Sequence, residues 1–103
     1  MRFLSFVAYD VAKTAEVAKA ADKLSSSPSQ MGKTLAQYAC LGMPFGGLPL
    51  NTAVAVSIVE AESADQMAAA AMTLAAAGAA VWFVPVLEVP VKGAAKVVKK
   101  ITA

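Results

Sequence analysis

The sequence predicts a single α+β domain in which an antiparallel sheet carries two helices on one face. Its 103 residues suffice for one hydrophobic core and leave no room for a second. Segments with the alternation of strands are interleaved with segments of helical periodicity. The expected order is strand, helix, strand, strand, helix, strand, with these elements at residues 2–9, 11–24, 33–40, 52–60, 63–78 and 81–89.

The first strand and the first helix are joined by Asp10. Both alternating sets of side chains in residues 2–9 are largely apolar, so both faces of this strand should be covered. Asp10 is a favourable N-cap, because its carboxylate can accept hydrogen bonds from the free amides of the first helical turn. The helix has one apolar stripe, formed by Val17, Ala20, Ala21 and Leu24.

The middle of the chain has the weakest signal. Residues 33–40 alternate like a strand, but a helix beginning at Ser29 is the competing interpretation, since short segments are ambiguous by period alone. Glycine and proline at residues 42–49 indicate a loop, and this loop is unusually apolar. Residues 52–60 are the clearest strand, with no polar face.

The last third of the chain opens with a capping box, Ser63 at the N-cap and Gln66 at the third helical position. Gly78 marks the end of this helix. Pro85 lies inside the strand expected at 81–89 and indicates an edge position or a bulge, because proline donates no ladder hydrogen bond. We assign residues 1–91 to the domain and 92–103 to a basic tail that forms a short amphipathic helix.

This order of elements is that of the ferredoxin-like, or split βαβ, arrangement. Such a unit packs both helices on one sheet face and leaves the other face bare. A bare face of Phe, Val and Ala side chains would be a larger apolar patch than soluble monomers usually expose. Alanine also accounts for 24 of the 103 residues and contributes little buried area. We therefore expect a homodimer that pairs through the open sheet face.

The composition excludes several classes of chemistry. The chain has no histidine, which excludes histidine general-base catalysis and His-ligated haem or metal. Its single cysteine excludes an internal disulfide and gives no support for an oxidising compartment, so we expect a cytoplasmic protein. Residues 67–87 are uncharged over the length of a membrane span, but their alanine content, Gly78 and Pro85 favour a helix, a turn and a strand. We expect no membrane partner.

Two segments resemble a known superfamily. Residues 56–65, VSIVEAESAD, resemble a strand-to-helix junction of small dimeric α+β barrel proteins, and residues 82–87, WFVPVL, resemble the last strand of one uncharacterised family within it. Relatives often have an aromatic residue or His at the end of the second strand, followed by a Gly-rich turn; here Tyr38 to Cys40 precede the glycines. The resemblance implies the fold, a dimer and a small-molecule cavity between sheet and helices. It transfers no catalytic residue, because the histidine is absent.

The best candidate for a ligand site is a group of apolar residues around the glycine-rich loop. This loop can close over a hydrophobic ligand, or it can pack across the dimer interface. The residues concerned are Tyr38, Cys40, Met43, Phe45 and Trp82. No pattern predicts a cofactor or a metal: the acidic residues near position 62 are explained by the adjacent helix N-terminus, where negative charge is stabilised.

These observations favour a homodimeric α+β barrel domain that binds a small apolar or aromatic molecule or serves as a structural module, without catalysis. One alternative is a cofactor-free monooxygenase or isomerase that uses the same cavity with Tyr38 or Cys40. The second is an accessory module that binds protein or nucleic acid through the tail lysines. Few aromatic residues accompany these lysines for base stacking, so a nucleic-acid partner is not expected. The lysines are Lys92, Lys96, Lys99 and Lys100.

Overall fold

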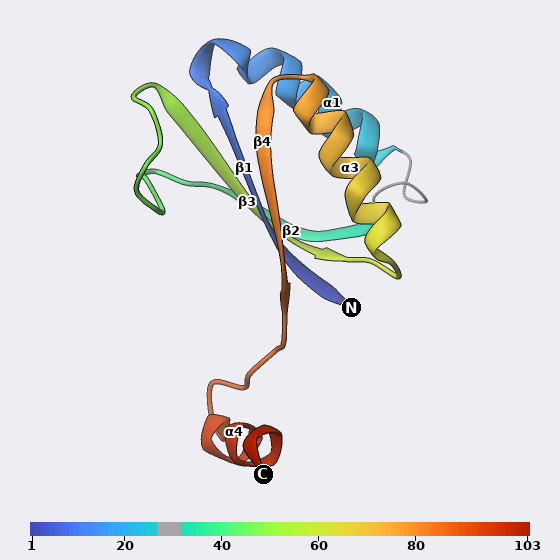
Figure 1. Cartoon of the computed structure of the whole chain (residues 1–103), viewed down its shortest axis with the longest axis vertical. Helices are drawn as coiled ribbons and strands as arrows, with labels where there is room; N and C mark the ends of the chain where they lie inside the picture. The colour runs from blue at the N-terminus through green and yellow to red at the C-terminus, as the bar shows by residue number, and fades with distance from the viewer. Residues whose placement is uncertain (27–31) are drawn as a thin grey trace.

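The structure is a computed structural model that describes residues 1–26 and 32–103. It is an α+β fold with one antiparallel sheet in the strand order β2-β3-β1-β4. The strands are β1 (Arg2–Asp10), β2 (Lys33–Ala39), β3 (Thr52–Glu60) and β4 (Ala79–Val86), and the helices are η1 (Val11–Lys13), α1 (Thr14–Ser25), α3 (Ala64–Ala76) and α4 (Ala94–Thr102). Figure 1 shows α1 and α3 side by side on one face of the sheet, with α4 set apart from both.

The strand predicted for the middle of the chain is confirmed over residues 33–39, where β2 pairs with β3. The competing helix would begin at Ser29, which lies outside the described residues. Residues 67–86 lie in helix α3, a turn at Gly78 and strand β4, and Leu87 follows the strand. Within the described ranges, no helix is both long enough and apolar enough to cross a membrane.

The strand predicted at residues 81–89 is wrong at both ends. β4 begins at Ala79 and stops at Val86, where its last pair joins Val86 to Arg2 of β1. Because β1 itself begins at Arg2, no neighbouring strand remains to pair with residues beyond Val86. Pro85 lies on an edge strand as expected, since β4 closes one side of the sheet.

Both predicted N-caps are present. The Asp10 carboxylate accepts a hydrogen bond from the Ala12 amide at 2.8 Å, although the first turn is a 3-10 turn and the α-helix starts only at Thr14. The Ser63 hydroxyl accepts from the Gln66 amide at 3.4 Å. The side chain of Gln66 reaches back one residue further than in the usual capping box and accepts from the Glu62 amide at 3.0 Å.

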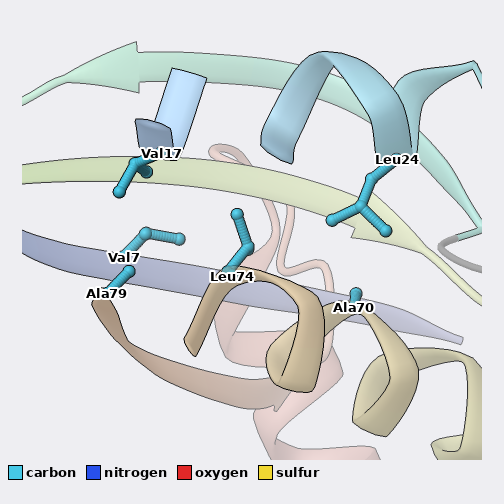
Figure 2. Packing of buried hydrophobic residues seen from close by; sticks show 6 residues of the cluster. All are labelled: Val7, Val17, Leu24, Ala70, Leu74 and Ala79. Atoms are coloured by element: carbon cyan, nitrogen blue, oxygen red, sulfur yellow. The ribbon is translucent and has the colours of Figure 1, made fainter. Parts of the chain in front are cut away.

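The core lies between the two helices and the helix-facing side of the sheet. Figure 2 shows Val17 of α1 and Leu74 of α3 close to Val7 of β1, and Leu24 of α1 further along on the side of Ala70 of α3. Leu24 is 2% exposed and Val59 is fully buried, and they are the largest fully buried side chains of the described residues. A second cluster joins Phe3, Val59, Ala61 and Met67. The predicted stripe of α1 therefore meets the sheet as expected.

None of the helices that the structure describes lies on the opposite sheet face (Figure 1). Strand alternation places Leu4 and Phe6 of β1 there, opposite to the buried Phe3 and Val7. Their cross-strand partners extend the same apolar surface. We call this surface the open face; its residues include Leu4, Phe6, Ile58, Trp82, Val84 and Val86. The last three are each about two-fifths exposed, at 42, 45 and 39%.

Candidate functional site

A cavity of about 350 Å³ lies between helix α1 and the sheet. Val17, Ala18 and Ala21 of α1 form its roof, and β1, β2 and β3 supply most of its floor. The exposed residues among its lining, including Ala18 and Gln37, mark the opening between α1 and β2. The buried residues of the lining mark the inner end of the cavity. We call this space the helix-side cavity.

The cavity exists because the facing side chains are small. The helical side contributes Ala18 and Ala21, and the strand side contributes Ala39, Ala55 and Ser57. Protein interiors are normally close-packed and contain few voids larger than a water molecule. A space of this volume therefore exceeds ordinary packing imperfection and lies at the lower end of the roughly 300–1,000 Å³ typical of ligand pockets.

A row of polar side chains crosses the floor of the cavity. Ser5 of β1 pairs in register with Ser57 of β3, and Ser57 pairs with Gln37 of β2. All three line the cavity. Side chains in such cross-strand pairs have Cβ atoms about 4.5–5.5 Å apart. The floor thus presents two hydroxyls and one amide in a line, each able to donate and to accept hydrogen bonds.

The two serine hydroxyls of this row are free to bind. Among the described residues, no side-chain hydrogen bond joins Ser5 or Ser57 to another group, although Ser5 is only 2% exposed. In the same part of the chain, every side-chain nitrogen or oxygen that is fully shielded from solvent has a hydrogen-bond partner. The Ser5 hydroxyl therefore opens on the cavity, where a bound molecule can reach it.

Among the described residues, no charged side chain lines the cavity. Tyr9 and Tyr38 are the titratable residues of this lining, which includes no carboxylate, amine or thiol. General acid–base catalysis needs a titratable group within hydrogen-bond reach of the reacting atoms. The arrangement is thus suited to hold an uncharged molecule, with an apolar body against Val7, Val17 and Phe83 and a polar edge on the serine row.

The residues proposed from sequence do not form one site. Tyr38 borders the helix-side cavity at the sheet edge and is 61% exposed. Phe45 and Trp82 lie on the other side of the sheet, and Cys40 and Met43 line neither space. Cys40 is half-buried, and its amide donates to the Val54 carbonyl at 2.9 Å. Met43 is 51% exposed in the loop.

Phe45 closes a second, shallower hollow against the open face. Its ring meets Phe6 and Trp82 edge-on, with ring centroids 5.6 and 5.4 Å apart. Gly46, Gly47 and Val84 complete a hollow of about 400 Å³, which we call the loop-side hollow. The three rings pack upon one another in the T-shaped geometry that stabilises aromatic pairs. The loop is therefore anchored to the open face by Phe45.

Of the acidic residues near the start of α3, Glu60 forms an ion pair with β1. Glu60 accepts from the guanidinium of Arg2 at 3.0 Å, and the same guanidinium reaches Glu88 at 3.1 Å. Ion pairs this exposed contribute little to stability. Nowhere in residues 1–26 and 32–103 do three His, Cys, Asp or Glu side chains gather in a group able to hold a metal ion.

The serine row is the part of the site that sequence reasoning missed. Its signal was nevertheless present, because Ser5 and Ser57 each interrupt an otherwise apolar strand. A polar residue that faces a core needs a partner or an opening. What the sequence did not show was the register that places the two serines opposite each other.

Comparison with known proteins adds no family to this geometry. No family model matches the chain, and no curated protein matches it at a significant level.

Proposed function

We propose that this chain is a homodimeric α+β barrel domain that binds a small, uncharged, largely apolar molecule in the helix-side cavity. The observation that supports this most directly is the cavity of about 350 Å³ with an apolar lining and a polar row on its floor. Ligand pockets typically combine apolar walls with a few placed polar groups that fix the orientation of the ligand. This cavity has that composition.

The ligand class follows from the lining. A charged ligand would leave its charge without a counter-ion in an apolar space, which is costly. A neutral molecule without polar groups would leave the buried Ser5 hydroxyl unpaired, which costs binding energy as well. The best fit is a flat ring compound with hydroxyl or carbonyl groups on one edge, spaced to meet hydroxyls roughly 5 Å apart.

The arrangement of the sheet supports the finer fold assignment. One β-α-β unit is β1-α1-β2 and the other is β3-α3-β4. In the strand order β2-β3-β1-β4, β3 lies between the two strands of the first unit and β1 lies between the two strands of the second. This interleaving is what a split βαβ unit requires. The uncovered apolar face supports pairing with a second copy. A dimer of this kind leaves the helix-side cavity of each copy accessible, because the cavity lies on the opposite side of the sheet.

Two related fluorescent probes test the proposal. N-phenyl-1-naphthylamine is neutral, and 8-anilino-1-naphthalenesulfonate has the same ring skeleton with an added sulfonate. We expect the neutral probe to bind with enhanced fluorescence and one site per chain, and the sulfonate to bind at least ten-fold more weakly. Equal binding of both probes would contradict an uncharged ligand, and binding of neither would contradict the cavity site.

Filling the cavity should abolish this binding. Ala21→Phe places a ring in the roof of the cavity, where Ala21 is half-buried and lines the space. Because the ring occupies free volume, the free energy of unfolding should fall by less than the ~1–3 kcal/mol typical of overpacked cores. Ala15→Phe, on the same helix but exposed and outside the lining, is the matched control and should bind the probe like the parent chain. Retained binding in Ala21→Phe would place the probe elsewhere, for instance on the open face.

Removing one hydroxyl of the polar row should discriminate between ligands. Ser57→Ala hardly changes the volume of the cavity but removes the central member of the row. Displacement of the neutral probe by 2-naphthol should weaken by about 2- to 10-fold, the value of one hydrogen bond. Displacement by naphthalene, which has no polar group, should not change. An equal effect on both competitors would indicate altered packing rather than a lost hydrogen bond.

A further inference from the structure

Helix α4 is amphipathic, and no other part of residues 1–26 and 32–103 covers its apolar side. Its spacing places Lys96, Lys99 and Lys100 on one side and an apolar stripe on the other, formed by Ala94, Val97, Val98 and Ile101. No residue of α4 is buried, and Val98 and Ile101 are 52 and 58% exposed. In Figure 1 the chain leaves the end of β4 and carries α4 away from the sheet.

A helix of this length needs a partner. α4 has nine residues, and isolated helices shorter than roughly 12–15 residues are marginal in water. Most helical stability in proteins comes from packing an apolar face. The segment before α4 adds further exposed apolar side chains, with Leu87 at 66%, Val89 at 47% and Val91 at 102%. The C-terminal segment thus exposes apolar side chains both before α4 and along its stripe.

The open face is the complementary unpartnered surface. Its exposed residues alone are fewer than the roughly 20–30 per side of a standard protein–protein interface. Phe45 already covers part of it. Adding the apolar side chains of residues 87–101 brings the shared surface closer to the size that a stable dimer needs. Every copy has both surfaces, the apolar side of α4 and the open face. In a dimer with two-fold symmetry, α4 of each copy can therefore cover the open face of the other, and all four surfaces are buried.

Charge favours the same arrangement. Lys92, Lys96, Lys99 and Lys100 give the tail four positive charges, whereas the rest of the chain has five basic and seven acidic residues. The tail of one copy is therefore attracted to the body of another. The apolar stripe provides the contact, and the lysines on the other side remain in water.

We propose that α4 of each copy packs across the β4 side of the open face of a second copy. The apolar stripe of α4, which includes Val97 and Ile101, lies on the open face of the partner at Trp82, Val84 and Val86. The α4 segment of the partner packs in the same way on the first copy; we call this exchanged segment the arm. This inference rests on the proposed homodimer but not on ligand binding in the helix-side cavity. It makes the C-terminal segment part of the dimer interface rather than a solvated tail.

Light scattering after size-exclusion chromatography, over a range of concentrations, tests the arm. Ile101→Asp places a charge in the apolar stripe and should weaken dimerisation at least ten-fold. Ala95→Asp introduces the same side chain and charge on the same helix, outside the stripe, and should leave the dimer unchanged. If Ile101→Asp dimerises like Ala95→Asp, the arm inference fails while the dimer stands. If the unaltered chain is a monomer, the homodimer fails and the inference with it.

Disulfide trapping distinguishes packing of α4 on the sheet of a partner from packing of α4 on the sheet of its own chain. In a Cys40→Ser background, one preparation carries Ile101→Cys and another carries Val84→Cys with a size tag. Mixing the two and oxidising them should give a cross-linked heterodimer on a non-reducing gel. A chain with both cysteines should likewise give cross-linked dimers. If that chain forms only an internal disulfide and the mixture no heterodimer, α4 packs on its own sheet and the exchange is overturned.

Discussion

Replacing Leu24 with alanine is expected to lower the free energy of unfolding by about 2–5 kcal/mol. Leu24 is 2% exposed and belongs to the core cluster that joins α1 to α3 and β1 (Figure 2). Its neighbours in this cluster include several alanines, which have no flexible atoms that could move into the space left behind. The substitution should therefore leave most of the removed volume as an unfilled cavity, and its effect should lie toward the upper end of this range.

Urea denaturation followed by circular dichroism measures this effect. Leu41→Ala is the matched control, because Leu41 is fully exposed in the loop and the same substitution there should change stability by less than about 0.5 kcal/mol. A shift of similar size in both variants would show that Leu24 does not lie in the cooperative core. A domain of this size has a stability of the order of 5–15 kcal/mol, so Leu24→Ala removes a large share of it.

Replacing Gly32 with alanine is the second large expected effect. Gly32 has φ = +78°, a left-handed conformation that costs an L-residue with a side chain roughly 1–2 kcal/mol. An added Cβ would also overlap the carbonyl oxygen of Glu60 and lie 3.1 Å from Cα of Ala61. Because both obstacles are backbone atoms, the start of β2 would have to move. We expect a loss of about 2–5 kcal/mol, from conformational strain and overpacking together.

Gly42→Ala provides the control for Gly32→Ala. Gly42 has no positive φ, and a Cβ there would meet nothing within 4 Å. This substitution should be neutral or slightly stabilising, because alanine restricts the unfolded chain. The two variants are compared by urea denaturation and by the near-ultraviolet spectrum of Trp82, which reports on the sheet. Equal stabilities would mean that the start of β2 does not approach β3 as closely as this geometry requires.

The secondary structure could be predicted where local signals are strong. The strand at 52–60 was predicted with its observed bounds, and Ser63 was correctly identified as the N-cap of α3. In both places the deciding interactions lie within a few residues along the chain. The prediction for 81–89 was wrong for the opposite reason. Residues 87–89 have the composition of a strand, but a strand ends where its partner ends, and β1 begins at Arg2.

The sequence predicted a cavity between the sheet and the helices but not the residues that line it. A cavity between the sheet and the helices was expected, and a cavity is present there. Of the five residues proposed to line it, only Tyr38 borders it. Tyr38 pairs with Val56 and Val56 pairs with Phe6, so strand alternation places the Tyr38 side chain on the open face. Phe45 and Trp82 were grouped with Tyr38 because all three are large and apolar, yet Phe45 packs on Phe6 and Trp82 across the sheet from the cavity. Apolar character alone does not indicate which face a loop will cover.

The sequence by itself determined the class of this fold, the capping residues Asp10 and Ser63 and the absence of histidine chemistry. These follow from composition, periodicity and capping residues, which act over short distances along the chain. Only the tertiary structure decided that Ser5, Ser57 and Gln37 stand in one row beneath α1. Their alignment depends on the register of three strands that are distant in sequence, and register is set by how the whole sheet pairs and packs.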